Sequence, residues 1–313
     1  MTNDFFDIEK LADGVFAAIG HLDGTAYSNA AIIDLGDRTI VVDTFMMPKP
    51  AEMLAQAAGE LTGRETALVL LTHFHQDHWG GATAFPNALY AASLNSRSTM
   101  LEEFDEYREW QQDPSDLAEG IESLKTKLAE EHTPEMRDAL EIRLRRNQLI
   151  LEQLPTLQFR APDITIGSEM TLHGSKRMAV VRVIEHGHTN SDLYIELPDC
   201  GIVICGDLAF FDTQPFMYYC DPEGWTAWIE AMEASDHQVF VPGHGPVGGK
   251  AELAILRAYI KALTSLVRDA MTRGDTVEQA IELKLPEPFA AWQAVEGGRF
   301  EAGVRGLYER FGT

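Results

Sequence analysis

The stretch Thr72-His73-Phe74-His75-Gln76-Asp77-His78 places three histidines and one aspartate within six residues. It directly follows Ala67–Leu71, an unbroken apolar run with the pattern of a strand that is buried on both faces. Because alternate side chains of an extended chain point the same way, His73 and His75 can present their imidazoles to one cation. The chain then turns at two glycines, which lets Asp77 and His78 face a neighbouring position. Imidazole and carboxylate groups at this spacing predict a metal site.

Three later motifs each place one histidine or aspartate in a predicted turn at the end of a strand. They are Gly187-His188-Thr189, Gly206-Asp207 and Pro242-Gly243-His244-Gly245. Binding sites of α/β proteins are commonly built at such positions. Each motif alone is weak, since Gly-Asp is an ordinary turn sequence. Together they can supply the remaining ligands of a two-metal centre.

Much of the remaining chain alternates short β-rich runs with turns, and helical spacing appears in a few longer segments. Apolar residues recur at helical spacing at 50–61, 250–270 and 276–285. The runs that predict strands are 15–19, 30–35, 39–42, 67–71, 170–172, 179–184, 193–197, 202–205 and 239–241.

The segment from about residue 93 to residue 155 interrupts this pattern with helical stripes and many charges. Asp113-Pro114 and Thr133-Pro134 each offer an N-cap followed by proline in the first helical turn. We therefore expect a helical hairpin inserted into the β-rich domain. Between Glu102 and Glu119 lie eight acidic residues and one base, Arg108. Two interpretations stay open: a solvated helical face, or a pocket wall or dimer contact.

The composition bounds the protein class and its partners. The 313 residues are 45% hydrophobic, which is typical of a folded globular protein, and the length allows one large domain or two ordinary ones. We expect a single domain over residues 1–313, with a C-terminal helical extension at about 250–313. With 25 Lys and Arg against 49 Asp and Glu, the formal charge of −24 disfavours nucleic acid and anionic membranes as partners. No apolar stretch approaches the roughly 20 residues that span a bilayer. An acidic N-terminus and three cysteines without a Cys-x-x-Cys motif favour a cytoplasmic protein with reduced thiols.

The motifs His-x-His-x-Asp-His, Gly-His-Thr, Gly-Asp and Pro-Gly-His-Gly, in this order, resemble those of the metallo-β-lactamase superfamily. The resemblance covers about residues 15–247 and implies an α/β fold of four layers, an αββα sandwich with metals at one edge of the paired sheets. It implies two divalent metal ions, most simply zinc, with iron or manganese as alternatives. The chain is similar to the broad hydroxyacylglutathione-hydrolase-like and unassigned hydrolases, although the glutathione-thioester signatures after Gly-Asp are missing.

Carried onto this sequence, the resemblance implies that one metal binds His73, His75 and His188. The second would bind Asp77, His78 and His244, and Asp207 would bridge the two. Two such metals share a water whose pKa falls to about 7, and the resulting hydroxide attacks a carbonyl carbon or a phosphorus. Asp77 is the expected catalytic residue, which orients the nucleophile and passes its proton to the leaving group.

The aspartate at the bridging position has diagnostic value within the family. True β-lactamases generally lack it, so Asp207 favours an ester, thioester, lactone or phosphoester as the bond that is cleaved. Asp43 matches the strand-end aspartate that supports the metal loop in this family.

Further residues beside the motifs are candidates for the pocket or for contacts behind the metal ligands. His186 lies two residues before His188, so it is either a site contact or an exposed structural residue. The other candidates are Phe45, Met46, Trp79, Phe210, Phe211 and Tyr218, with core packing as the alternative for each aromatic ring. Few Lys or Arg lie near the motifs, which favours a small, largely apolar substrate.

Other activities compete with the dinuclear hydrolase. The same fold can serve an iron-dependent redox enzyme of the persulfide dioxygenase type, or a β-lactam or phosphoester hydrolase. A nuclease is disfavoured by the charge, and a non-catalytic binding module by the intact ligand set. The expected partner is a small-molecule substrate, and the helical insertion is a candidate homodimer contact.

Overall fold

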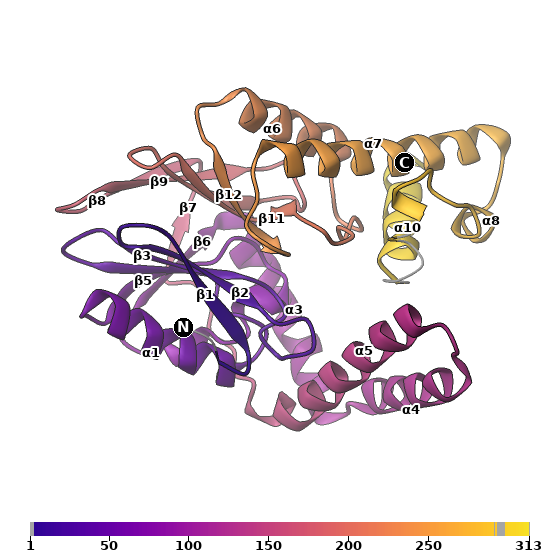
Figure 1. Cartoon of the computed structure of the whole chain (residues 1–313), viewed down its shortest axis with the longest axis horizontal. Coiled ribbons are helices and arrows are strands. Elements are labelled where there is room, and N and C mark those ends of the chain that lie inside the picture. The colour runs from indigo at the N-terminus through magenta and orange to yellow at the C-terminus, as the bar shows by residue number, and fades with distance from the viewer. Residues whose placement is uncertain (1–2, 291, 293–297, 313) are drawn as a thin grey trace.

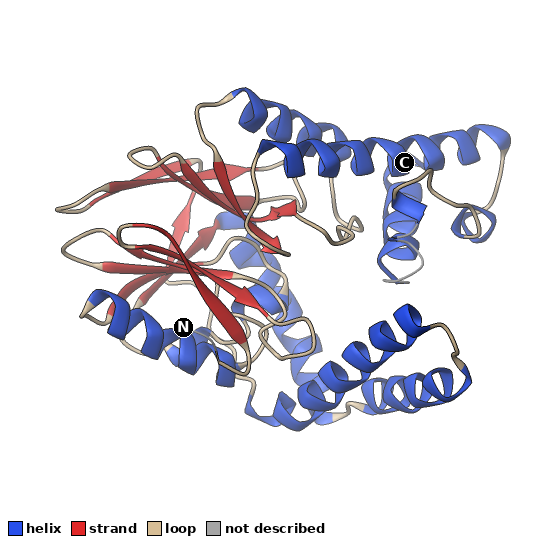
Figure 2. Ribbon diagram, in the orientation of Figure 1, coloured by secondary structure: helices blue, strands red, loops and turns tan. Residues whose placement is uncertain are grey.

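Two β-sheets pack face to face between two layers of helices in the computed structural model, which describes residues 3–290, 292 and 298–312 (Figures 1 and 2). This is the four-layer αββα sandwich that the sequence predicts. None of the helices within these described residues is long and apolar enough to cross a membrane.

The first sheet contains seven strands among the described residues, in the order of the sequence. Strands β1 to β4 are antiparallel, and β4 to β7 run parallel to one another. The parallel strands end on the same edge, which is where connecting loops can converge. The strands are β1 Phe6–Ala12, β2 Val15–Gly20, β3 Ala30–Asp34, β4 Thr39–Val42, β5 Thr66–Leu70, β6 Leu89–Ser93 and β7 Ile164–Ile166.

The second sheet has five strands in the described residues, in the order β12-β11-β10-β9-β8. Only the β11–β12 pair is parallel, and the other pairs are antiparallel. The strands are β8 Glu169–His173, β9 Met178–Ile184, β10 Asp192–Leu197, β11 Ile202–Phe210 and β12 Val239–His244.

Helices cover the outer faces of both sheets and extend beyond them. Figure 1 shows α1 and α3 beneath the first sheet, α6 and α7 above the second, and α4 with α5 projecting to one side. The longer helices are α1 Pro48–Thr62, α3 Leu94–Gln112, α4 Ser115–Glu130, α5 Pro134–Gln153, α6 Pro222–Ala234, α7 Lys250–Arg273 and α10 Gly298–Gly312. Short turns of helix are α2 Gln76–Trp79, η1 Ala82–Ala84, η2 Leu154–Thr156 and α8 Val277–Ile281.

An apolar layer between the sheets fixes their relative position. Ile33, Ile40 and Leu70 of the first sheet belong to the same buried cluster as Ile195 and Ile204 of the second. All five side chains are at most 3% exposed. Burying such a side chain is worth roughly 1.5–3 kcal/mol, so this layer is a main source of the free energy that holds the halves together.

The inserted segment contains three helices where the sequence indicated two. The additional helix, α3, packs Met100 and Phe104 against the first sheet, while the predicted hairpin corresponds to α4 and α5. The α3 segment carries so many charges that its apolar stripe is narrow, which hides the helical period.

The sequence pattern also missed three strands, β1, β6 and β7, and one longer helix, α6. In β1 only Phe6 is buried, and β7 is three residues long, so neither shows clear alternation. Helix α6 did have a readable signal: Asp221 accepts a hydrogen bond from the Gly224 amide and Pro222 follows it in the first turn.

The inter-sheet layer can be tested with one core truncation. We expect Ile195→Ala to lower the free energy of unfolding by about 3 kcal/mol, because the cavity left between two packed sheets cannot collapse. The matched control is Ile255→Ala, at a side chain that is 44% exposed on α7, with an expected loss below about 1 kcal/mol. Urea unfolding followed by circular dichroism measures both. Equal losses would contradict the assignment of this layer as the core.

Candidate metal centre

The polar motifs of both sheets meet at one edge of the sandwich. Asp43 follows β4 and the histidine motif follows β5, whereas His188 lies on the loop between β9 and β10. Hydrogen bonds tie the two sheets together at this edge. The Leu193 amide donates to the Thr72 carbonyl at 2.6 Å, and the Asn29 side-chain amide donates to the carbonyl of Pro242 at 2.9 Å.

Asp207 lies inside a strand, in contrast to the turn that the sequence predicted. Strand β11 continues through Gly206-Asp207 to Phe210, with register shifts on both sides of Gly206. Gly206 has a φ of +53°, and an added Cβ would lie 2.6 Å from the Thr72 side chain. The irregularity re-aims the Asp207 side chain toward the first sheet, as strand bulges commonly do beside sites.

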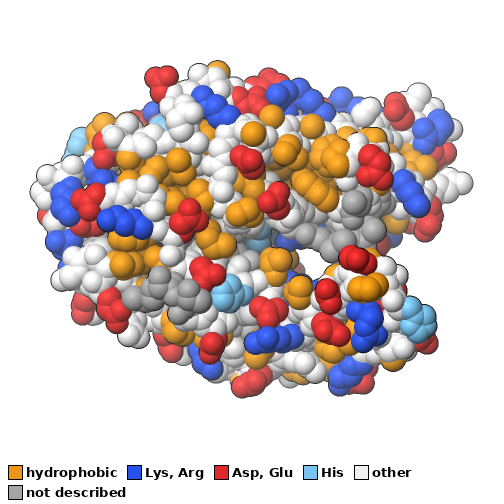
Figure 3. Space-filling view, viewed as in Figure 1, with side chains coloured by type: hydrophobic (Ala, Val, Ile, Leu, Met, Phe, Trp, Pro, Cys, Tyr) orange, Lys and Arg blue, Asp and Glu red, His pale blue; other side chains and the backbone are white. Residues whose placement is uncertain are grey.

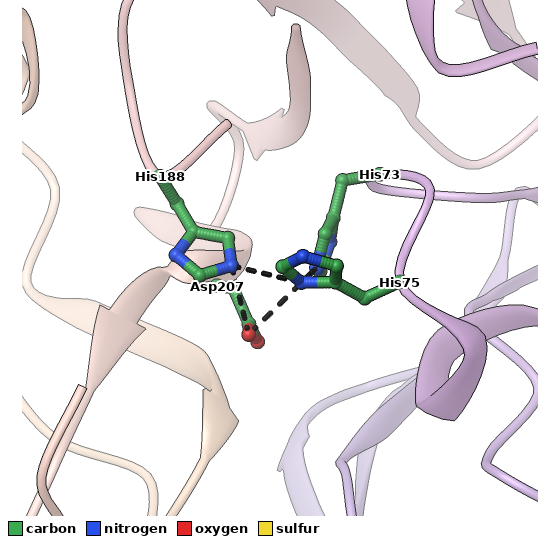
Figure 4. A group of neighbouring side chains, drawn as sticks. All are labelled: His73, His75, His188 and Asp207. Carbon is green, nitrogen blue, oxygen red and sulfur yellow. Dashed lines mark hydrogen bonds and ion pairs between the residues drawn. The ribbon is translucent and has the colours of Figure 1, made fainter. Parts of the chain in front are cut away.

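The first cluster consists of His73, His75, His188 and Asp207, whose side chains converge on one point (Figure 4). His75 Nδ1 lies 2.9 Å from His73 Nε2 and 3.1 Å from His188 Nε2. Asp207 Oδ2 lies 3.4 Å from His188 Nε2 and 3.7 Å from His73 Nε2.

The second cluster consists of Asp77, His78 and His244. Asp77 Oδ2 lies 3.1 Å from His244 Nε2 and 3.7 Å from His78 Nε2. The other oxygen of Asp207, Oδ1, lies 3.1 Å from His78 Nε2 and 3.5 Å from His244 Nε2. The two oxygens of Asp207 therefore face different clusters, which is the arrangement of a bridging carboxylate.

Contacts behind the ligands fix which ring nitrogen faces each cluster. Thr72 Oγ1 donates to Asp43 at 2.8 Å, so it accepts from His73 Nδ1 at 3.0 Å and leaves the lone pair of His73 Nε2 free for a ligand. His78 Nδ1 donates to Asp43 Oδ2 at 2.7 Å, so His78 Nε2 likewise faces inward with a lone pair. Such outer hydrogen bonds orient metal-binding histidines and raise their basicity.

The residues present fit a metal on grounds of hydrogen bonding and donor chemistry. His78 Nε2 and Asp207 Oδ1 are buried and have no hydrogen-bond partner among the described residues. Leaving such atoms without a partner costs free energy that a bound cation would remove. Five imidazoles and two carboxylates form a donor set that suits zinc, iron or manganese better than calcium.

Burial and charge give the two clusters different protonation. Burial is the main cause that lowers the pKa of His75 to about 4 and that of His188 to about 3. These imidazoles stay neutral, as metal ligands must be. Burial also disfavours the cationic form of His244, but the carboxylates of Asp207 and Asp77 outweigh it and raise the pKa of His244 to about 9.

A family model for the metallo-beta-lactamase superfamily matches residues 23–244. The chain belongs to the metallo-β-lactamase superfamily. A metallo-beta-lactamase from Pontibacter korlensis has a similar structure, with a TM-score of 0.58 and 16% identity over 82% of this chain and 99% of that chain. The metallo-beta-lactamase FIM-1 from Pseudomonas aeruginosa, in its mono-zinc form, gives 0.55 and 15% over 82% and 95%. At these identities the similarity shows the fold alone. No curated protein matches the chain.

Two of the residues predicted around the metallo-β-lactamase metal ligands contact those ligands directly. Asp43 accepts hydrogen bonds from His78 and from the Thr72 amide and hydroxyl. Phe210 lines the cavity above the clusters and stacks on His244, with ring centroids 5.2 Å apart and planes 11° apart.

Other pocket candidates lie in the core instead of the cavity. Phe45 is fully buried and packs on Phe6, with ring centroids 5.1 Å apart. Trp79 is buried among the rings of α3 and donates to the Phe74 carbonyl at 2.7 Å. Phe211 belongs to the cluster between the second sheet and its helices.

Met46, Tyr218 and His186 also lie apart from the described lining of the cavity. The carbonyl of Met46 accepts from Gln76 Nε2 at 2.5 Å, which fixes the loop backbone instead of offering the side chain. Tyr218 donates to Glu309 at 2.9 Å. His186 has a side chain that is 70% exposed and lies 3.4 Å from Asp221, so the tight loop at Gly187 breaks its alternation with His188.

A cavity of about 650 Å³ lies over the two clusters, and its walls include residues that sequence reasoning did not select. Figure 3 shows the surface hollowed between the insertion helices and the side of the molecule that carries α7 and α10. Long-range folding brings these residues in, so no local motif marks them. They are Tyr27, Glu103, Glu106, Tyr107, Trp110 and Arg299. Phe216 and Tyr219, from the aromatic stretch that follows Asp207 in the sequence, also line the cavity.

Three of these wall residues are charged, which revises the expectation of a largely apolar pocket. Arg299 lies at the start of α10 and reaches Tyr27, where its Nη2 donates to the hydroxyl at 2.6 Å. The sequence suggested few bases near the motifs because Arg299 is remote from them along the chain.

The support that Asp43 gives to the second cluster can be tested by Asp43→Asn. Oδ1 of Asp43 accepts from the Thr72 amide, and Oδ2 accepts from both the Thr72 hydroxyl and His78. Asparagine offers one acceptor oxygen and an NH₂ group that cannot accept, so it cannot serve both positions, and it removes the negative charge beside His78. We expect the metal affinity of the Asp77–His78–His244 cluster to fall about 10–100-fold. Metal content after dialysis against a buffered chelator measures this loss. Asp37→Asn removes an equal charge from an exposed turn and should change nothing, and unchanged metal content in both variants would contradict the role of Asp43.

Proposed function

We propose that this metallo-β-lactamase superfamily protein is a dinuclear metal-dependent hydrolase that cleaves an ester, lactone, thioester or related bond of a small substrate. The observation that carries the proposal is the convergence of five imidazoles and two carboxylates on two adjacent points beneath a cavity. Zinc is the proposed metal, with iron and manganese as alternatives. The charged wall residues make a substrate with both apolar and charged parts a better match than a purely apolar one.

The ligand set would hold one ion at His73, His75 and His188 and a second at Asp77, His78 and His244, with Asp207 between them. Two bound divalent ions would lower the pKa of a coordinated water to about 7 and polarise the oxygen of the scissile bond. The protein contributes fixed ligand directions, because Thr72 and Asp43 hold the rings of His73 and His78 from behind.

Asp77 is the proposed catalytic residue, since it is a cluster member that also lines the cavity. Burial raises the pKa of its carboxyl, but His78 and His244 outweigh that effect and the net shift is downward. The carboxylate is therefore ionised at neutral pH and can accept a hydrogen bond from an attacking water. In the proposed mechanism it orients this water and relays its proton to the leaving group.

Tyr27 is proposed to act on the substrate from the opposite wall. Its ring lies 5.1 Å from the ring of His244, edge to face. The Arg299 guanidinium donates to its hydroxyl, which leaves the hydroxyl proton free to be donated to a substrate oxygen. A donor fixed in this way can stabilise negative charge that develops on that oxygen.

The test is a substrate panel on metal-replete protein, followed by Asp77→Asn. The panel contains lactones, aryl esters, thioesters, phosphotriesters and a chromogenic β-lactam. For any substrate that is turned over, we expect Asp77→Asn to lower kcat by about 10²–10⁴-fold, because the water loses its orienting carboxylate. Metal content measured on the same samples separates loss of metal from loss of chemistry.

Asp116→Asn, an equal change of charge on the exposed face of α4, is the control and should leave kcat unchanged. Full turnover by Asp77→Asn would contradict the proposed role. Stoichiometric iron together with oxygen uptake, in protein purified without added zinc, would replace the hydrolase by the redox alternative.

A further inference from the structure

One face of helix α3 presents two carboxylates and two aromatic rings to the cavity. Glu103, Glu106, Tyr107 and Trp110 all line it, and they follow the three-, four- and seven-residue spacing of a single helical face. Glu102 and Glu109 belong to the same helix but are exposed and lie outside the lining. The acidic segment therefore has both a solvated side and a side that forms the cavity wall.

The two cavity carboxylates have no counter-ion within the part of the chain that the structure describes. Neither Glu103 nor Glu106 forms a side-chain hydrogen bond or ion pair with any described residue, whereas Asp105 between them pairs with Arg108 at 2.5 Å. Burial, with the charges of Glu106 and Glu102, raises the pKa of the half-buried Glu103 to about 7. Glu103 is half-buried, whereas Glu106 is exposed at the cavity rim. A partly desolvated carboxylate without a partner is costly unless a cation joins it.

Aromatic rings on the facing loop complete this part of the cavity. Phe216 and Tyr219 both line it, and each ring centroid lies 5.6 Å from that of His75. Glu103 and Tyr219 line the same cavity, and burial together with the charge of Glu103 raises the pKa of Tyr219. Aromatic faces around a negative charge are the setting that attracts alkylammonium groups.

Arg299 is the one arginine or lysine in the described lining, and it forms no ion pair with Glu103 or Glu106. Arg299 donates to Thr213, to the Gln214 carbonyl and to the Tyr27 hydroxyl, so its hydrogen bonds serve the protein. The floor of the same cavity holds Asp207, whose buried Oδ1 has no hydrogen-bond partner among the described residues and faces the proposed metal position.

We propose that the cavity recognises substrates that carry a cationic amine or quaternary ammonium group. Glu103 and Glu106 bind this group against the rings of Tyr107, Trp110, Phe216 and Tyr219, and the scissile bond of the same molecule reaches the metal clusters. The choice of bond rests on the proposed hydrolase function, whereas the ammonium site itself does not depend on that function.

The experiment compares choline with 3,3-dimethylbutan-1-ol, its neutral isostere, by calorimetry on the full chain with and without metal. We expect choline to bind at least about tenfold more tightly, since the two differ only in charge. Glu103→Gln with Glu106→Gln should abolish this preference. Glu102→Gln with Glu109→Gln carries the same change of charge outside the cavity and should retain it.

A second variant, Trp110→Leu, tests the same site in case the Glu103/Glu106 variant does not fold. Trp110→Leu should weaken choline binding several-fold and leave the carboxylates in place, and the urea midpoint of every variant is measured alongside. Acetylcholine and 3,3-dimethylbutyl acetate then form a matched substrate pair. Choline binding that needs Glu103 and Glu106, with no hydrolysis of either ester, would support the ammonium site and count against the proposed bond class.

Three outcomes would overturn the proposal. One is equal affinity for choline and the neutral alcohol. Another is unchanged choline binding by the Glu103/Glu106 variant. The third is a loss of metal in that variant while choline still binds, which would show that the two acids balance the charge of the metal centre instead of binding substrate.

Discussion

The arrangement of the site depends on one carboxylate that is shared between two histidine clusters. Asp207 directs Oδ2 toward His188 and Oδ1 toward His78, which come from different sheets. This geometry exists only if the sheets keep their relative position to within a fraction of an ångström. The apolar layer between them and the hydrogen bonds of Asn29 and Thr72 across the edge provide that constraint. The packing between the sheets therefore determines the geometry of the site.

Building the site has a conformational cost that the surrounding contacts offset. Asp43 has a φ of 60° and Phe45 a φ of 66°, both in the left-handed region that side chains rarely adopt. Such a residue costs on the order of 1–3 kcal/mol. At Asp43 the hydrogen bonds from His78 and Thr72 offset this free-energy cost. At Phe45 the burial of the ring against Phe6 offsets it. The loop is strained because it must aim Asp43 back beneath the metal ligands.

The sequence predicts the residues of the two His/Asp clusters far better than the cavity around them. His73 to His78 are neighbours in the chain, and the other ligand motifs each end or interrupt a strand with a readable apolar pattern. Residues such as Glu103 and Arg299 reach the cavity only through tertiary packing, so nothing beside them in the sequence marks their role. Predictions from the alternation of side chains along an extended chain also fail where the backbone bends. By its spacing His186 should point the same way as His188, but the turn at Gly187 separates the two side chains. Aromatic residues beside the motifs divide between core and cavity for the same reason.

The acidic residues behind the charge of −24 are distributed among the two His/Asp clusters, the cavity wall and the solvent-exposed surface. The family model matches residues 23–244, whereas Arg299 reaches back from beyond that range to Tyr27. On the other side, α3 turns part of the acidic segment inward and leaves the rest in solvent. The ligand clusters determine what chemistry the edge of the sandwich can support. The helical insertion and the C-terminal helix supply Glu103, Glu106 and Arg299, which are the charged groups of the described cavity lining outside the two clusters.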